Sequence, residues 1–151
     1  MNEYNRNPKD YHPEMHSAEH VLNQTMVRMF NCGRAFSAHI EKKKSKCDYR
    51  FERNLTADEV AAVQKKVNEV VLANLPVSES FLSRDEAAAR FNLARLPEEA
   101  GSTIRVITIG DYDACPCSGV HAPSTGVLGN FTIVSTDCNN GVLRVRFKLQ
   151  S

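Results

Sequence analysis

The chain has 151 residues, of which 42% are apolar and 25% are charged. This is one domain's worth of chain with an ordinary globular composition, which excludes fibrous and intrinsically disordered proteins. Lys and Arg number 19 against 18 Asp and Glu, a formal net charge of +1. That balance argues against a protein that grips a long duplex by charge alone, but it leaves contact with the end of an RNA open.

The composition predicts a cytoplasmic protein outside the membrane. No apolar run approaches the roughly 18 residues that a spanning helix needs. The polar N-terminus leads into no hydrophobic stretch, so we expect no secretory signal. The five cysteines, an odd number, fit a reducing compartment with free or metal-bound thiols. We expect residues 1–13 to be a flexible segment and residues 14–151 to form a single domain.

An amphipathic helix opens the predicted fold. Pro13 suits the first turn of a helix, and apolar residues then recur at helical spacing at Leu22, Met26 and Met29. Gly33 follows as a stop. The pattern therefore predicts a helix over residues 14–31.

Two capping boxes, TADE at 56–59 and SRDE at 83–86, predict further helix starts. The first opens a helix with a valine stripe that ends before Pro76, and the second opens a short helix to about Phe91. Alternating, aromatic or β-branched residues predict strands at 34–40, 47–51, 77–82, 103–109, 131–135 and 142–149. Asn140 and Gly141 predict a hairpin turn between the last two.

The predicted order is α-β-β-α-β-α-β-β-β. It indicates an α+β fold with two layers, in which a mostly antiparallel sheet packs on a long central helix.

Two pairs of metal-ligand residue types share the same spacing. HSAEH at 16–20 places His16 and His20 one turn apart on the same helix face. CSGVH at 117–121 places Cys117 and His121 on a predicted loop. Three imidazole nitrogens and one sulfur make a tetrahedral zinc shell. Four protein ligands favour a structural site unless one of them yields to water or substrate, so spacing alone leaves both kinds of site open.

Other chemistry in the same segments is less consistent with the sequence. HSAEH also matches the inverted zinc-protease pattern, with Glu19 as the base, but one small domain leaves little room for a substrate cleft. That pattern would also leave Cys117 and His121 unexplained. Cys115 and Cys117 lack the CxxC spacing of a redox pair. We expect the remaining thiols and histidines to be ordinary core, surface or hydrogen-bonded residues: Cys32, Cys47, Cys138, His12 and His39.

The turn at residues 41–46 carries four lysines: Lys42, Lys43, Lys44 and Lys46. A solvated loop is the simpler interpretation. Contact with phosphates near an RNA end is the functional one, because a few lysines suffice there.

The paired motifs resemble those of the editing domain of alanyl-tRNA synthetase, which occurs with related motifs in threonyl-tRNA synthetase. HSAEHVL at 16–22 resembles that domain's HxAxHLL segment. RVITIGDY at 105–112 resembles its RVxxIGDY strand. CSGVH, followed by TGVLGNF at 125–131, resembles its CGGTHxxxTGxIGxF block. The resemblance covers about residues 14–150.

The resemblance implies a free-standing AlaX-type trans-editing protein, a cytoplasmic aminoacyl-tRNA deacylase that uses zinc and needs no ATP. Its partner would be the 3′ acceptor end of a mischarged tRNA. The ester would be that of Ser-tRNA(Ala), or in some relatives Gly-tRNA(Ala), and Ser-tRNA(Thr) would share the same chemistry. The family's zinc ligands carry over onto four matching residues: His16, His20, Cys117 and His121.

Other site roles follow less directly from the resemblance. Thr125, Ser118 and Gly119 are candidate substrate contacts, although Ser118 and Val120 depart from the family's GGT sequence. Glu19 is a candidate base, or a group that holds the second nitrogen of a histidine. The alternative function is a non-catalytic, zinc-stabilised module that binds tRNA ends or a partner protein.

Overall fold

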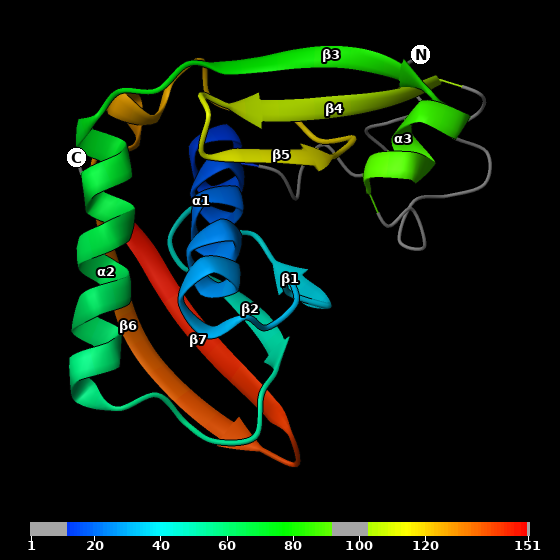
Figure 1. The fold of residues 1–151 in the computed structure, drawn as a ribbon. Coiled ribbons are helices and arrows are strands. Elements are labelled where there is room, and N and C mark those ends of the chain that lie inside the picture. Colours follow the sequence, from blue (N-terminus) through cyan, green and yellow to red (C-terminus); the bar gives the residue numbers. More distant parts are fainter. Residues whose placement is uncertain (1–11, 92–102, 151) are drawn as a thin grey trace.

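A computed structural model describes residues 12–91 and 103–150 (Figure 1). The first part contains α1 (Pro13–Phe30), β1 (Ser37–His39), β2 (Ser45–Arg50), α2 (Ala57–Leu72), β3 (Val77–Ser83) and α3 (Arg84–Arg90). The second contains β4 (Thr103–Ile109), β5 (Asp113–Pro116), the short 3-10 helix η3 (Thr125–Leu128), β6 (Asn130–Asn139) and β7 (Val142–Gln150). The predicted α+β class is confirmed. The expected flexible segment at residues 1–13 lies, apart from its last two residues, outside the described part.

The strands form two antiparallel sheets, with orders β1-β2-β7-β6 and β3-β4-β5. The expected antiparallel pairing is therefore present, but it is divided between two sheets. One strand was not predicted. β5 was expected to be loop, yet it pairs with β4 in the register Ile107↔Cys115.

Helix α1 lies between the two sheets, and it shares one side of the four-stranded sheet with α2 (Figure 1). Alternate residues of β2, β6 and β7 face these helices, and the largest of them, Tyr49, Phe131 and Phe147, are fully buried. The Tyr49 hydroxyl donates to Asn23 Oδ1 of α1 over 2.7 Å, which fixes the rotation of α1 on the sheet. Burial of this apolar surface is the main stabilising contribution to the fold.

The end of α1 differs from the prediction. Asn31 adopts the left-handed conformation, with φ of 54°, and its N–H donates to the Val27 carbonyl. Asn tolerates this conformation better than most residues do, so the helix ends before Gly33. Met29 was expected in the core, but it lies on the last turn and is 39% exposed.

Both predicted capping boxes are present. Thr56 and Glu59 exchange side-chain-to-backbone hydrogen bonds at the start of α2, and Ser83 and Glu86 do so at the start of α3. Helix α2 ends at Leu72, earlier than the proline pattern predicted.

The hairpin turn between β6 and β7 is also confirmed. Asn140 and Gly141 have φ values of 51° and 77°, as a two-residue turn between twisted strands requires. Within the described residues, no helix is both long enough and apolar enough to cross a bilayer.

Candidate metal centre

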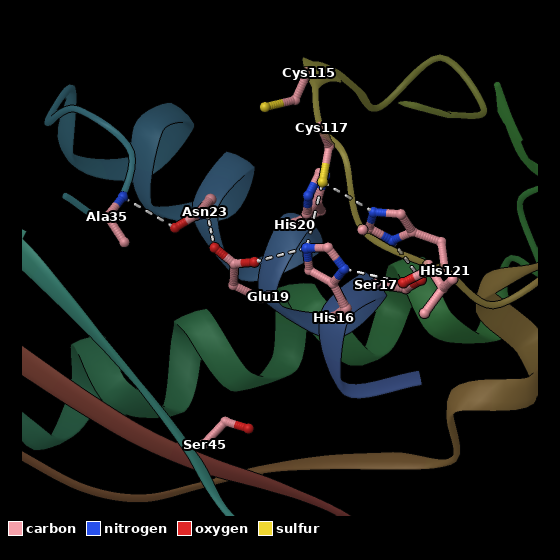
Figure 2. Close-up of polar contacts among 12 residues, drawn as sticks. His16, Ser17, Glu19, His20, Asn23, Ala35, Ser45, Cys115, Cys117 and His121 are labelled. Atoms are coloured by element: carbon pink, nitrogen blue, oxygen red, sulfur yellow. Dashed lines mark hydrogen bonds and ion pairs between the residues drawn. The ribbon is translucent and has the colours of Figure 1, made fainter. Parts of the chain in front are cut away.

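The two predicted ligand pairs meet in space. Helix α1 contributes His16 and His20 from its N-terminal half, and the loop after β5 contributes Cys117 and His121 (Figure 2). One ligand atom from each residue lies within 4.8 Å of the other three. Cys117 Sγ is 3.4 Å from His16 Nε2 and 3.5 Å from His121 Nε2. Spacings of this size let four side chains surround a single metal ion.

The second nitrogen of each histidine meets a different partner. His16 Nδ1 lies 3.0 Å from the Val120 carbonyl oxygen, and His121 Nδ1 lies 3.0 Å from Ser17 Oγ. His20 Nδ1 lies 3.6 Å from Asp113 Oδ2. In each ring the Nδ1 contact leaves Nε2 for the centre. Outer contacts of this kind orient metal-ligating histidines and set their tautomers.

Asp113 and Arg34 are site residues that the sequence did not indicate. The Asp113 side chain is buried, and Arg34 binds both of its oxygens, with Nη1 2.7 Å from Oδ1 and Nη2 3.3 Å from Oδ2. Burial raises the pKa of Asp113, but His20 and Arg34 outweigh it and hold that pKa below its usual range. The charged Asp113 carboxylate therefore faces Nδ1 of His20, on the side of the ring away from the cluster.

The electrostatics favour a thiolate at the centre. Burial raises the pKa of Cys117, but the charge of His20 and hydrogen bonds from His121 and His16 hold it well below its usual range. Burial also lowers the pKa of His121 to about 3, so this ring is neutral near neutral pH. For His20, burial lowers the pKa, but the Cys117 thiolate and Asp113 raise it by more. A thiolate among imidazoles is a donor set that attracts a metal cation.

Strand β4 holds the loop that carries Cys117. Arg105 Nη1 donates to the carbonyl oxygens of Cys117 (3.1 Å) and Gly119 (2.7 Å). Its Nε donates to Glu79 Oε2 on β3 over 2.6 Å. The Ser17 hydroxyl accepts the Ala122 N–H over 2.9 Å, so α1 holds the other end of the loop. These contacts fix the ligand loop from both sides.

Glu19 lies beside the cluster. Its side chain is largely buried, and one oxygen accepts a hydrogen bond from Asn23 Nδ2 over 2.9 Å. The other oxygen lies 3.6 Å from His16 Nε2, the nitrogen that faces the centre. Glu19 therefore does not hold the second nitrogen of His16, which contacts Val120 instead.

The three candidate substrate contacts have different surroundings. Ser118 is half-buried and Gly119 is buried, and both lie within the ligand loop. Thr125 is fully buried, and its hydroxyl donates to the Val70 carbonyl and accepts the Leu75 N–H, each over 2.8 Å. A substrate contact at this hydroxyl would have to break bonds that join η3 to the end of α2.

The lysine turn at residues 41–46 is not part of the four-residue cluster. Lys42, Lys43 and Lys44 are exposed, whereas Lys46 is half-buried on β2. Among the described residues, no hydrogen bond or ion pair joins these four side chains to the metal-ligand group.

The remaining thiols and histidines lie outside the cluster. No disulfide joins the cysteines of the described residues, and the Cys115 thiol contacts the carbonyl of Pro116. His12 caps α1, and His39 forms an exposed ion pair with Glu41.

Comparison with known proteins relates the chain to tRNA synthetases. Residues 104–145 match the model of the threonyl and alanyl tRNA synthetase second additional domain. The chain is 31% identical over 132 residues to the alanine–tRNA ligase of Fervidobacterium nodosum, and 32% identical over 133 residues to that of Coxiella burnetii. It is 31% identical over 137 residues to the alanine–tRNA ligase of Methanopyrus kandleri.

These matches cover 86 to 87% of the chain but only 15% of each relative, so the chain corresponds to one part of those much longer proteins. The matched region includes Cys117 and His121 within the family model, and the longer alignments span most of the described residues. The chain is therefore similar along most of its length to one part of alanine–tRNA ligases, and its residues 104–145 match the second additional domain of threonyl and alanyl tRNA synthetases.

Proposed function

We propose that this chain is an aminoacyl-tRNA deacylase that hydrolyses a mischarged tRNA ester in trans, with Ser-tRNA(Ala) as its main substrate. The observation that carries the proposal is the convergence of His16, His20, Cys117 and His121 within 4.8 Å, in a chain similar along most of its length to alanine–tRNA ligases. Gly-tRNA(Ala) is the second substrate to test.

Zinc is the metal that the donor set fits best. Three imidazole nitrogens and a thiolate match its ligand preferences, and each imidazole already has an outer contact that leaves Nε2 for the metal. In the proposal the zinc would be held by these four residues: His16, His20, Cys117 and His121. Zinc bound there would supply Lewis-acid chemistry beside the ester carbonyl.

The protein's own groups carry the proton and orient the substrate. Hydrolysis adds the hydroxyl of water to the aminoacyl carbon and returns a proton to the ribose oxygen as the ester bond breaks. We assign the role of base to Glu19, because its Oε1 faces the cluster while Asn23 holds the other oxygen. The hydrogen bond to Asn23 keeps the carboxylate in place for this role.

Selection of serine over alanine needs a polar group that the serine hydroxyl satisfies. We assign this contact to Ser118 and the backbone of Gly119, since the Thr125 hydroxyl is already bonded twice. A site built to hydrogen-bond a hydroxyl discriminates strongly against the analogue that lacks it, because its buried polar groups are then left unpaired. Lys42, Lys43, Lys44 and Lys46 are assigned to phosphates of the tRNA.

The proposal is tested by adding the purified, zinc-loaded chain to Ser-tRNA(Ala), with Ala-tRNA(Ala) in a parallel reaction. We expect rapid loss of the serine ester while the alanine ester is spared. Gly-tRNA(Ala) and Ser-tRNA(Thr) then separate the choice of amino acid from the choice of tRNA. Absence of hydrolysis of all three mischarged tRNAs, from protein that carries its metal, would reject the proposal.

One observation favours a second function, that of a non-catalytic metal-stabilised binding module. The four ligands join α1 to the loop after β5, as a structural site would. Removal of the metal separates the two functions, because a purely structural metal contributes to folding outright.

A further inference from the structure

The four-stranded sheet has an outer side that the described helices do not cover. Its inner side faces α1 and α2 through Cys47, Tyr49, Val145 and Phe147. Because side chains alternate along a strand, the residues between these point the other way. The outer residues of β2 and β7 are Lys46, Asp48, Arg50, Val142, Arg144, Arg146, Lys148 and Gln150.

Positive charge gathers at one end of this outer side. Lys46 pairs across the strands with Arg146, and Lys148 lies two residues further along β7. The turn before β2 adds three exposed lysines at the same end, since Ser45 pairs with Phe147. We call this group the basic end; it consists of Lys42, Lys43, Lys44, Lys46, Arg146 and Lys148.

The lysines of the basic end are available to a partner. Within residues 12–91 and 103–150, none of the five forms an ion pair or hydrogen bond, although the charge of Lys46 helps to lower the pKa of Asp48. The next outward-facing pair along the two strands differs, because Arg144 binds both oxygens of Asp48. Arg146, which also belongs to the basic end, forms an ion pair with Asp137 on β6, and its Nη1 lies 2.7 Å from Asp137 Oδ2. A chain whose net charge is only +1 therefore gathers in one place five lysines that have no ion-pair partner among the described residues.

The basic end lies at the end of the sheet where β6 begins, after the segment that follows the metal-ligand loop. After His121 the chain forms η3, which contacts α1 and α2, and then enters β6 at Asn130. Asn130 pairs with Gln150, and Thr132 pairs with Lys148. The first residues of β6 therefore join the ligand loop to the strand that carries Lys148.

The chemistry of this surface points to a phosphate backbone rather than to bases. The outer residues of β2 and β7 include no aromatic ring, and the aromatic residues of these strands, Tyr49 and Phe147, face the core. Surfaces that bind single strands use exposed aromatic rings on which bases stack. Lysines spread over a sheet instead provide point charges for phosphates at several positions.

We propose that the basic end is the docking surface for the duplex part of the tRNA acceptor arm, whose 3′ end then reaches the cluster. The inference rests on the proposed function for the identity of the RNA, and it extends the RNA contact from the lysine turn onto β7. The occupant is a polyanionic duplex, and the argument for it is charge complementarity. Recognition there is of backbone charge, without base readout.

The test uses an uncharged RNA hairpin with an acceptor-stem duplex and a CCA end, and fluorescence anisotropy reports binding to the full chain. The variant is Lys46→Glu/Lys148→Glu. The matched control is Lys65→Glu/Lys66→Glu, which makes the same change in net charge on exposed lysines of α2, on the other side of the sheet. Thermal unfolding verifies that each variant folds, and Lys46→Gln/Lys148→Gln repeats the test without charge reversal.

We expect Lys46→Glu/Lys148→Glu, the sheet variant, to weaken hairpin binding about tenfold at about 50 mM salt. The affinity of the control variant should stay within about twofold of the wild type. Between about 50 and 200 mM salt, the slope of log affinity should fall by about two, one for each lost phosphate contact. Equal weakening by the two variants, or no weakening by either, would overturn the proposal. A single-stranded oligonucleotide that loses as much affinity as the hairpin would overturn the assignment to duplex.

Failure of this proposal is distinguishable from failure of the proposed function. Hydrolysis of Ser-tRNA(Ala) by the wild-type chain, with hairpin binding insensitive to the sheet variant, would reject the docking surface alone. Loss of hairpin binding in the sheet variant, with no hydrolysis by the wild-type chain, would reject the deacylase alone.

Discussion

Asp113 shapes the candidate metal centre although it is not one of the four ligands. Its carboxylate is buried behind His20 and is held in place by two hydrogen bonds from Arg34. Replacing Asp113 by Asn removes the charge that orients His20. We expect Asp113→Asn to weaken zinc affinity about 10- to 100-fold, as measured by competition with a chromophoric chelator.

The matched control for this substitution is Asp137→Asn, which changes an exposed carboxylate in an ion pair with Arg146. It should leave zinc affinity unchanged. Equal affinities for Asp113→Asn and the wild type would show that Asp113 does not act on the metal centre.

The four candidate ligands could be identified from the sequence as two pairs that converge, but their supporting residues could not. His16 and His20, like Cys117 and His121, occur as local pairs, and local spacing is visible in a sequence. Arg34 and Asp113 are 79 positions apart and belong to no local pattern, so only the fold brings them together. The burial of the Thr125 hydroxyl likewise depends on where α2 ends.

The capping box at the start of α2 can be tested separately from the rest of the fold. The Thr56 side chain accepts the Glu59 N–H, and the Glu59 side chain accepts the Thr56 N–H. We expect Thr56→Ala to lower the free energy of unfolding by about 1 kcal/mol, measured by urea denaturation.

The same substitution at the second box, Ser83→Ala, should cost less. Helix α3 packs against a small separate cluster around Ala87 and Ile104, whereas α2 packs on the main core. A larger loss of stability at Ser83 than at Thr56 would contradict this ranking.

Strands β2 and β7 are joined on their outer side by the ion pair between Asp48 and Arg144. Hydrogen bonds from Arg144 hold the pKa of Asp48 below its usual range, against burial, which raises it. A carboxylate with a lowered pKa stabilises the fold at pH values above its unfolded pKa of about 3.9, and this contribution is lost as the pH falls through the folded pKa. We therefore expect Arg144→Gln to destabilise the protein near neutral pH and progressively less at acid pH.

Stability of this variant and the wild type is compared by denaturant unfolding across that range. A difference between them that stays constant down to strongly acid pH would contradict the electrostatic origin of the effect.

The observed ends of the strands show which boundaries a local sequence pattern can predict. The alternation in β6 predicted a strand ending at residue 135, but the strand continues to Asn139 after a bulge between Ile133 and Ser135. The bulge shifts the alternation of inward and outward residues by one position. The sequence pattern therefore breaks near the bulge, although the strand itself continues. β5 was missed because it is short, contains Pro116 and gains its strand character from pairing with β4.

At the scale of the whole molecule, the core is large enough to fold without the metal centre. Fully buried residues of α1, β2, β6 and β7 pack together in the main core, among them Leu22, Tyr49, Phe131 and Phe147. Domains that need zinc to fold are those whose cores are too small. We therefore expect a strong chelator to abolish deacylation while the circular dichroism spectrum and cooperative unfolding persist at a lower melting temperature.

Unfolding of the chain on chelation would instead support the metal-stabilised binding module. Restoration of activity by added zinc would show that chelation had not simply inactivated the protein irreversibly.

We propose that the cluster on α1 and the loop after β5 holds the zinc that ester hydrolysis requires. The most direct measurement is the rate of Ser-tRNA(Ala) hydrolysis by Cys117→Ala and by Cys115→Ala, with the zinc content of each protein determined. Cys115 lies two residues away, and its thiol contacts only the Pro116 carbonyl among the hydrogen bonds of the described structure. We expect Cys117→Ala to fold but to lose zinc and activity, while Cys115→Ala keeps both. Wild-type hydrolysis by Cys117→Ala would contradict this proposal.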